Sequence, residues 1–210
     1  MTTGQRRTQA ERRAATRSAL LESAARGLSR YGYGNLRLEQ VAKEAGYTRG
    51  ALYHQFQDKQ DLTLAVVSDW WRDQWRAVVL PLVERETDPV SALLALARGH
   101  AIFCRREVAR VPIALRLEFT GQDHPVGRQV EHNYDLLVRH CQKLIEAGRD
   151  DAAIPTGTPE RVLAIAYVGA LEGTVIGLAG RSPHDEQFAV RAVAGVLGIG
   201  HSTDPCRETE

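Results

Sequence analysis

The residues with the clearest binding chemistry lie in the segment Leu38–Phe56, which reads LEQVAKEAGYTRGALYHQF. Two short helices joined by a turn at Gly46 fit this segment, and that spacing is typical of a helix-turn-helix. On the second helix, Arg49, Tyr53 and His54 are expected to point outward. A second helix that presents its first residues to a major groove is how this motif reads DNA.

Apolar residues of the same segment predict how the two helices are held. Val41 and Ala42 face inward on the first helix, while Leu52 and Phe56, four residues apart, are the inward anchors of the second. Thr48 is a suitable N-cap for the second helix because its hydroxyl can accept a backbone N–H. The segment therefore predicts a helix pair that buries one face and exposes the other.

Apolar residues recur at intervals of three and four along almost the whole chain, which predicts an all-α fold of about nine helices. Caps, glycines and prolines set their expected bounds. The expected helices are Gln9–Tyr31, Leu38–Ala45, Arg49–Phe56, Lys59–Glu84, one from Pro89, one over 107–120, Asp123–Ala147, and two that follow the cap-plus-proline pairs Thr158-Pro159 and Ser182-Pro183, ending near Gly180 and Leu197.

The fourth expected helix has an apolar stripe whose register the sequence leaves open. Val66 or Val67, and then Trp70 or Trp71, fit the spacing equally well. Pro81 is expected to kink or fray the last turns of this helix, because proline lacks the N–H that an interior position needs.

Charge is divided unevenly along the chain. The total of 27 Lys and Arg against 26 Asp and Glu gives a net charge of +1. Residues 1–61 hold 11 bases and 6 acids, net +5, and the remainder holds 16 bases and 20 acids, net −4. This asymmetry favours a nucleic-acid surface in the first part of the chain. A solvated helix face rich in arginine is the alternative interpretation.

Composition argues against several other classes of protein. Cys104, Cys141 and Cys206 are odd in number and form no CxxC pair, which disfavours a disulfide scaffold or thiolate zinc site and favours the reducing cytoplasm. His100 and Cys104 are four residues apart, but with no third ligand evident we predict neither metal nor cofactor. The apolar run 162–180 is interrupted by glycines and predicts a buried helix, so no membrane partner is expected.

The pattern over Val41–Leu62, V-A-x-x-A-G-Y-T-R-G-A-L-Y-H-Q-F-x-x-K-x-x-L, closely resembles the TetR family of bacterial transcriptional regulators. The resemblance covers residues 15–65 in detail and the rest only in layout. It implies a homodimeric repressor, not an enzyme, that a small apolar or aromatic effector releases from a palindromic double-stranded DNA operator. The expected domains are a DNA-binding domain over 1–61, a ligand-binding and dimerisation domain over 62–198, and a disordered tail over 199–210.

The resemblance implies roles in DNA binding for eight residues, which are Arg37, Thr48, Arg49, Gly50, Ala51, Tyr53, His54 and Lys59. Arg49 would take a guanine through its O6 and N7, with Gly50 and Ala51 allowing close approach. Lys59 would bind a phosphate as a point charge. Packing of Tyr53 against the first helix, and a merely solvated His54, are the alternatives.

The start of the second helix departs from the family pattern, which places Ser or Thr there as a cap. Here the stretch reads Asn35-Leu36-Arg37, so that Asn35 would cap an early start and Arg37 would supply the phosphate contact. A basic arm at the start of the chain either enters a minor groove or remains a disordered, solubilising tail. Its residues are Arg6, Arg7, Arg12 and Arg13.

The layout of the remaining chain predicts a ligand pocket, with ordinary core packing as the alternative for each residue. The candidate lining is Trp71, Trp75, Phe103, Phe119, Tyr134 and Glu172. Glu172 stands in an apolar helix, where it would meet a cationic ligand or pair with an arginine such as Arg116.

The last two helices carry the pattern of an interface between two copies of the chain. Gly169, Gly173 and Gly177 recur every four residues and permit close approach of helices. A matching stripe on the final helix consists of Phe188, Ala192 and Val196. The resemblance points to a two-fold dimer built as a four-helix bundle, which would place two recognition helices on a palindrome.

Two other classes of function compete with this interpretation. A small helical enzyme would need a nucleophile with its base, or a metal cluster, and no spacing in the sequence suggests either. An interaction module that has lost DNA binding would not need the intact pattern over Arg49–Phe56.

Overall fold

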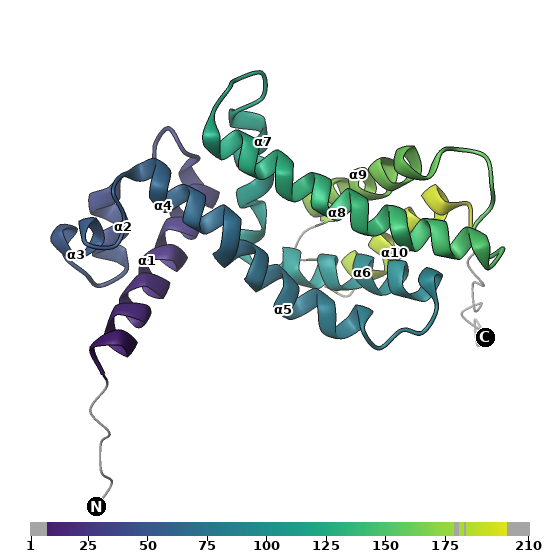
Figure 1. Ribbon diagram of the computed structural model, residues 1–210, viewed down its shortest axis with the longest axis horizontal. Coiled ribbons are helices and arrows are strands. Elements are labelled where there is room, and N and C mark those ends of the chain that lie inside the picture. The colour runs from purple at the N-terminus through teal and green to yellow at the C-terminus, as the bar shows by residue number, and fades with distance from the viewer. Residues whose placement is uncertain (1–7, 179–180, 183, 201–210) are drawn as a thin grey trace, which may run out of the picture. The chain divides into compact units, whose positions relative to one another are not determined.

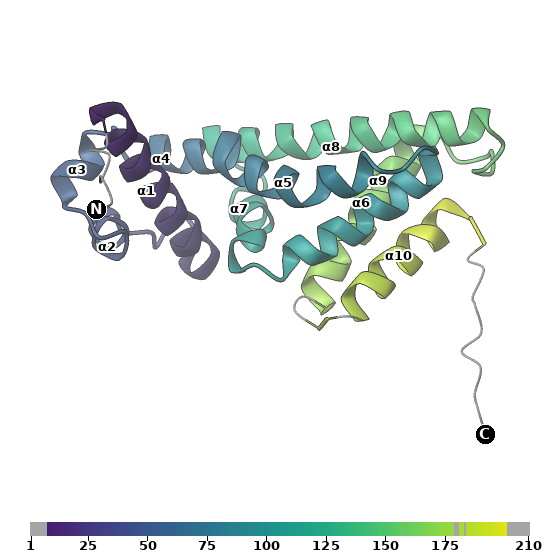
Figure 2. The same ribbon diagram turned by 90° about the horizontal axis from the view of Figure 1, so that it is seen from below.

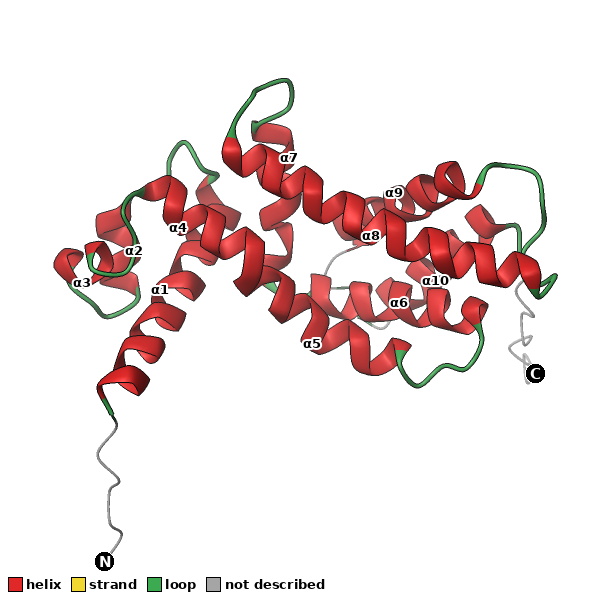
Figure 3. Ribbon diagram, in the orientation of Figure 1, coloured by secondary structure: helices red, strands yellow, loops and turns green. Residues whose placement is uncertain are grey.

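The computed structural model describes residues 8–178, 181–182 and 184–200. All regular structure in these residues is helical, as Figures 1 and 3 show, and the prediction of an all-α fold is confirmed. In chain order the elements are α1 (Gln9–Tyr31), α2 (Leu38–Glu44), α3 (Arg49–Tyr53), α4 (Lys59–Ala65), a π-helical turn η1 (Val66–Trp70), α5 (Trp71–Val83), α6 (Pro89–Cys104), a 3-10 turn η2 (Glu107–Arg110), α7 (Val111–Glu118), α8 (Pro125–Asp150), α9 (Glu160–Leu178) and α10 (His184–Leu197). No helix in these ranges combines the length and apolarity needed to cross a membrane.

Side-chain caps start several helices where the sequence places them. Thr8 and Glu11 form a capping box at α1, since the Thr8 hydroxyl accepts from the Glu11 N–H and the Glu11 carboxylate accepts from the Thr8 N–H. Asp58 accepts from the Asp61 N–H at 2.8 Å and starts α4. The bounds of α1 match the prediction, although Tyr31, which the apolar spacing places on its inward face, is 45% exposed.

Several predicted helix ends differ from the observed ones by one turn or less. Helix α2 ends at Glu44, and α3 ends at Tyr53 because Gln55 already donates to Leu52 in a tighter turn. Helix α8 runs through Gly148 to Asp150. A Cβ on Gly148 would lie 2.7 Å from Cδ1 of Ile154, so this glycine permits the close return of the chain instead of ending the helix.

Helices α4 and α5 form one continuous helix with a π turn at Val66–Trp70, where the N–H of Trp71 reaches the carbonyl of Val66. The Asn133 side chain donates to the carbonyl of Val67 at 2.7 Å and so satisfies an acceptor in the widened turn. Both Val66 and Val67 are fully buried. A π turn adds one residue to the repeat, which explains why either valine fits the sequence pattern.

Two compact units make up the fold. The first consists of Met1–Gln74 with Arg106–Asn133, and the second of Trp75–Arg105 with Tyr134–Glu210. Each has its own apolar core. The first unit thus includes η2, α7 and the start of α8, a grouping by contact that does not follow the functional boundary predicted after residue 61. The functional division into domains stays a prediction, and most of the predicted tail, residues 201–210, lies outside the described residues.

The second unit is built on the packing of α6 against α9 and α10 (Figures 1 and 2). The Tyr167 hydroxyl, fully buried on α9, donates to the carbonyl of Leu93 on α6 at 2.6 Å. At the other end of α6, Arg105 donates to both carboxylate oxygens of Asp185 at 2.8 Å and to Glu186 at 2.5 Å. These bonds fix α6 against both C-terminal helices.

Replacing Asp185 by Asn should destabilise the protein by about 1–3 kcal/mol, because it removes the charge from a bidentate ion pair in which Asp185 is buried and Arg105 is partly exposed. The hydrogen bonds from Arg105 lower the pKa of Asp185 below its usual value of 3.8. The stabilisation is therefore present at neutral pH and lost as the pH falls through that lowered pKa. Urea unfolding at pH 7 measures the effect.

The matched control for this variant is Asp151→Asn, the same chemical change at an exposed position after α8. It should alter the free energy of unfolding by less than about 0.5 kcal/mol, as is usual for surface substitutions. An equal loss of stability in both variants would contradict the role given to the Arg105–Asp185 pair.

Candidate nucleic-acid interface

The segment α2–α3 is held together by a buried seam and a tight turn. Gly46 adopts a φ of +78°, which favours glycine, and the N–H of Tyr47 donates back to the carbonyl of Ala42 at 2.9 Å. Leu52 and Phe56 are almost fully buried in the core of the first unit. The structure thus gives these two anchors the inward positions expected from their spacing.

The outer face of this segment carries most of the predicted DNA-binding residues. Those that are exposed are Arg37, Thr48, Arg49, Gly50, Tyr53 and His54, whereas Ala51 and Lys59 are half-buried. Thr48 caps α3 by accepting from the Ala51 N–H at 3.2 Å, which leaves its own O–H free to donate outward. Tyr53 is 43% exposed, so it is a surface residue and not part of the buried core.

Arg49 is held on this face by an acid and a ring. Its Nη1 lies 3.0 Å from Oε1 of Glu39 on α2, and its Nη2 donates to the Tyr53 hydroxyl at 3.4 Å. The guanidinium lies 5.3 Å from the centre of the Tyr53 ring. The hydrogen bond with Tyr53 and the charge of Glu39 raise the pKa of Arg49, so the group presents a fixed positive charge.

Lys59 has partners within the protein at the start of α4. Its ammonium donates to the carbonyls of Tyr33 at 2.9 Å and Gly34 at 3.2 Å, and lies 4.4 Å from the centre of the Tyr33 ring. An ammonium has three donors, so one remains for a phosphate. In the structure, these hydrogen bonds connect the α1–α2 loop to the start of α4.

Helix α2 begins at Leu38 with Arg37 as the N-cap residue. The expectation that Asn35 would cap an earlier start is wrong, because its side-chain amide donates to the carbonyl of Tyr31 at 3.3 Å. The Arg37 side chain makes no cap hydrogen bond and is exposed. Of the predicted basic arm, Arg12 and Arg13 lie exposed within α1. Arg6 and Arg7 lie outside the described residues.

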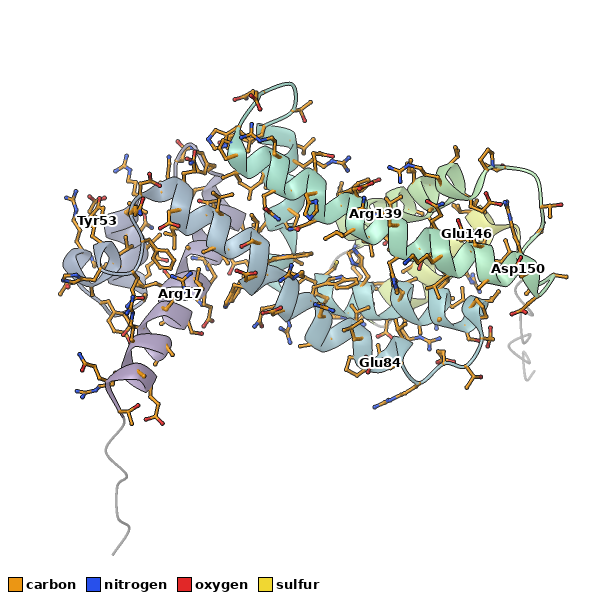
Figure 4. All side chains as sticks on the ribbon, in the orientation of Figure 1. Arg17, Tyr53, Glu84, Arg139, Glu146 and Asp150 are labelled. Atoms are coloured by element: carbon orange, nitrogen blue, oxygen red, sulfur yellow. The ribbon has the colours of Figure 1, made fainter. Side chains whose placement is uncertain are left out.

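Two further residues join this surface that the sequence did not single out. Arg17 on α1 donates to the carbonyl of Gln55 at 3.4 Å and lies 4.5 Å from the centre of the Phe56 ring. Figure 4 shows Arg17 on α1 and Tyr53 at the end of α3. Glu39 is the other, through its pair with Arg49. Arg17 and Glu39 could not be singled out from the sequence, because many other residues carry the same charges. Only the fold brings these two to the outer face of α2–α3.

The end of α1 is fastened to the η2–α7 segment of the same unit. Arg30 makes two hydrogen bonds with the Glu107 carboxylate, which lower the pKa of that acid. The Glu118 carboxylate accepts from the backbone N–H of Tyr33 at 2.7 Å and of Gly34 at 2.6 Å. Carboxylate bonds to backbone N–H groups are charge-assisted and strong, so they fix the loop that leads into α2.

The candidate pocket residues fall in both units. In the first, Trp71 donates to the carbonyl of Val108 at 2.9 Å, and buried Phe119 stacks on His124 with ring centres 4.1 Å apart. The second unit holds the other four, which are Trp75, Phe103, Tyr134 and Glu172. Arg116 forms a salt bridge with Glu131 at 2.8 Å, and its pairing with Glu172 stays a prediction.

An open groove of about 420 Å³ lies elsewhere in the second unit. Its lining includes Val90, Leu94 and Pro155, none of which is a candidate pocket residue. We therefore do not assign the groove to the predicted pocket, and the pocket itself stays a prediction.

The predicted interface glycines lie on a face of α9 that the described residues leave open. A Cβ added to Gly169, Gly173 or Gly177 would meet no heavy atom within 4 Å. Phe188 on α10 is 48% exposed, whereas Val196 already packs partly against the core of the second unit. Further exposed apolar side chains on α9 are Val162, Ile165 and Ile176.

Comparison with known proteins places this architecture among transcriptional regulators. The sequence profile described as "Bacterial regulatory proteins, tetR family" matches residues 20–66. The regulator AcrR of Shigella flexneri is 44% identical over 170 residues, 75% of each chain. The regulator BetI of Agrobacterium fabrum is 28% identical over 128 residues, 61% of this chain and only 59% of BetI.

Solved structures of regulators share the fold. The TetR-family regulator SCO4454 of Streptomyces coelicolor has a TM-score of 0.73 at 22% identity, covering 88% of this chain and 95% of its own. AibR, solved in complex with isovaleryl coenzyme A and operator DNA, has a TM-score of 0.72 at 21% identity, covering 88% of this chain and 100% of its own. At this level of identity the likeness is one of fold.

Replacing Glu118 by Gln should loosen the α1–α2 loop, because a neutral amide oxygen accepts more weakly than a carboxylate. We expect a loss of about 1–2 kcal/mol in stability and faster hydrogen exchange at the amides of Tyr33 and Gly34. Glu84→Gln, on an exposed residue after α5, is the control. Unchanged exchange at both amides in the Glu118 variant would contradict this role.

Proposed function

Because the chain belongs to the TetR family of bacterial regulatory proteins, we propose that it is a repressor that a small molecule releases from a palindromic operator. The observation that carries the proposal is the outer face of α2–α3, where Arg49 and Tyr53 stand exposed above the buried anchors Leu52 and Phe56. A side chain of this kind can reach a base edge while the helix behind it stays fixed.

In this proposal Arg49 reads a base and its neighbours hold the DNA backbone. The guanidinium exchanges its contact with Glu39 for the O6 and N7 of a guanine. Thr48, Tyr53, His54 and Arg37 offer hydroxyl, imidazole and guanidinium donors to phosphates, which are sequence-independent contacts. The excess of bases over acids in residues 1–61 supports the encounter with a polyanion.

Arg49→Ala should weaken binding to the cognate operator about 5- to 150-fold and relax specificity at one base pair, because a bidentate guanine contact is lost. The measurement is a gel shift with the DNA upstream of the protein's own gene. Arg139→Ala removes the same charge from α8 in the second unit and should leave binding within about twofold. Equal losses of affinity for the operator in the two variants would contradict a role of Arg49 in base recognition.

We further propose that the protein acts as a homodimer through α9 and α10. Helix α9 is apolar on both its buried and its exposed sides, and a helix of that kind is buried in the assembled protein. The open glycines Gly169, Gly173 and Gly177 allow a second helix to approach its backbone closely. A two-fold dimer would offer two α3 helices to successive half-sites.

Ile176→Asp should convert the dimer to a monomer without unfolding it, since Ile176 is 73% exposed in the single chain and a buried unpaired charge disfavours association. Analytical ultracentrifugation reports the mass, and circular dichroism reports the helix content. Leu117→Asp, at a site 72% exposed on α7, is the matched control and should stay dimeric. A dimer in both variants would place the interface elsewhere.

Release from DNA is proposed to follow from a shift in population. An effector held in the second unit favours a spacing of the two α3 helices that no longer fits both half-sites. Two of the three boundaries between the units, after Gln74 and after Asn133, fall within α5 and α8, so each of these two helices contributes residues to both units. The π turn at Val66–Trp70 supports this view, because such turns are frequent at functional sites.

A further inference from the structure

A buried histidine in the second unit makes a hydrogen bond that its position on α6 explains. A Cβ on Gly99 would lie 3.1 Å from Cα of Val79, so α5 and α6 approach closely at this point. Trp75 is one turn before Val79 and therefore lies beside His100. The Trp75 indole N–H donates to Nδ1 of His100 at 3.0 Å, with the two rings edge to face.

This hydrogen bond determines where the imidazole carries its proton. An indole nitrogen is only a donor, so Nδ1 of His100 must offer its lone pair. Burial lowers the pKa of His100 to about 4, and the ring is therefore neutral at physiological pH. A neutral imidazole with a free lone pair on Nδ1 carries its hydrogen on Nε2.

The Nε2–H donor has no hydrogen-bond partner among the described residues, although His100 is only 8% exposed. A buried donor without a partner is unfavourable, and native proteins satisfy nearly all such groups. Phe103 and Cys104, the neighbours of His100 at the end of α6, are also buried. An apolar residue would pack at this position without the cost of burying an unpaired donor. The donor at this position therefore indicates that an acceptor binds here.

We propose that Nε2–H of His100 is the hydrogen-bond donor of the effector site, and that the effector is an uncharged, largely apolar molecule with a carbonyl-type oxygen. This inference rests on the proposed function as an effector-responsive regulator. A neutral donor suits an uncharged acceptor, and a hydrogen bond from a buried group fixes the orientation of such a ligand.

A metal ion suits the same residues poorly. The lone pair of Nδ1 is engaged by Trp75, and burial raises the pKa of the Cys104 thiol to about 12, so the thiolate that binds metals is disfavoured. No group of three potential ligands comes together in the parts of the chain that the structure describes. His100 and Cys104 are therefore not proposed as a metal site.

The test compares benzophenone with diphenylmethane, in which a methylene group stands in place of the carbonyl group. Nitrogen-15 NMR of the histidine rings in the full-length protein should show His100 as the Nε2–H tautomer. Benzophenone should shift its Nε2–H resonance and bind about 5- to 10-fold more tightly than diphenylmethane, the range expected for one neutral hydrogen bond. If the site is too narrow for benzophenone, the smaller ketone cyclohexanone tests the same hydrogen bond.

Two variants separate the hydrogen bond from packing. His100→Gln keeps an acceptor for Trp75 and an N–H donor, and should retain the preference for the ketone. His100→Phe should abolish that preference. The proposal is overturned if neither ketone shifts the Nε2–H resonance of the wild-type protein, or if a well-folded His100→Phe keeps the preference. The wild-type NMR result decides the question even if His100→Phe does not fold.

Gel shifts with upstream DNA on the same preparations separate this inference from the proposed function. Wild type should bind that DNA, and benzophenone should weaken this binding, whereas benzophenone should not change the DNA binding of His100→Phe. A wild type that binds the ketone but no DNA would reject the repressor and leave the His100 site standing. A wild type that binds DNA but gives no ketone-dependent shift at Nε2–H rejects the His100 site alone.

Discussion

The burial of Leu52 and Phe56 is the constraint on which the outer face of α2–α3, with its predicted DNA-binding residues, depends. Helix α3 has five residues, and a helix so short has no stability of its own in water. Its conformation is therefore set by the core of the first unit, into which both side chains project. Arg17 covers the outer side of the Phe56 ring, and the exposed side chains Arg49 and Tyr53 are positioned only as well as those anchors are packed.

The second unit uses buried polar groups for two different purposes. Some are fully satisfied and fix the fold, as when Arg105 holds the Asp185 carboxylate with two parallel hydrogen bonds. The Tyr167 hydroxyl does the same for α6 and α9. His100 differs, because one ring nitrogen accepts from Trp75 while the other is buried without a partner among the described residues. That contrast makes His100 a candidate for binding in a unit where Asp185 and Tyr167 serve stability.

Much of this organisation could be predicted from local sequence signals. The bounds of α1, the Thr48 cap and the inward anchors of α3 follow from short-range spacing and capping chemistry. The choice between Val66 and Val67 could not be made, because a π turn breaks the repeat on which such a choice rests. The Glu118 contacts and the grouping of η2 and α7 with the first unit depend on residues far apart in sequence, which spacing does not reveal.

In the proposed repressor, two copies of α3 read DNA as a symmetric pair. Hydroxyl-radical footprinting of the full-length protein on the DNA upstream of its gene tests it most directly. We expect two protected half-sites related by a two-fold axis, with centres about one helical turn of 10–10.5 base pairs apart or a multiple of it. A single protected site without symmetry, or uniform protection that does not depend on sequence, would contradict it.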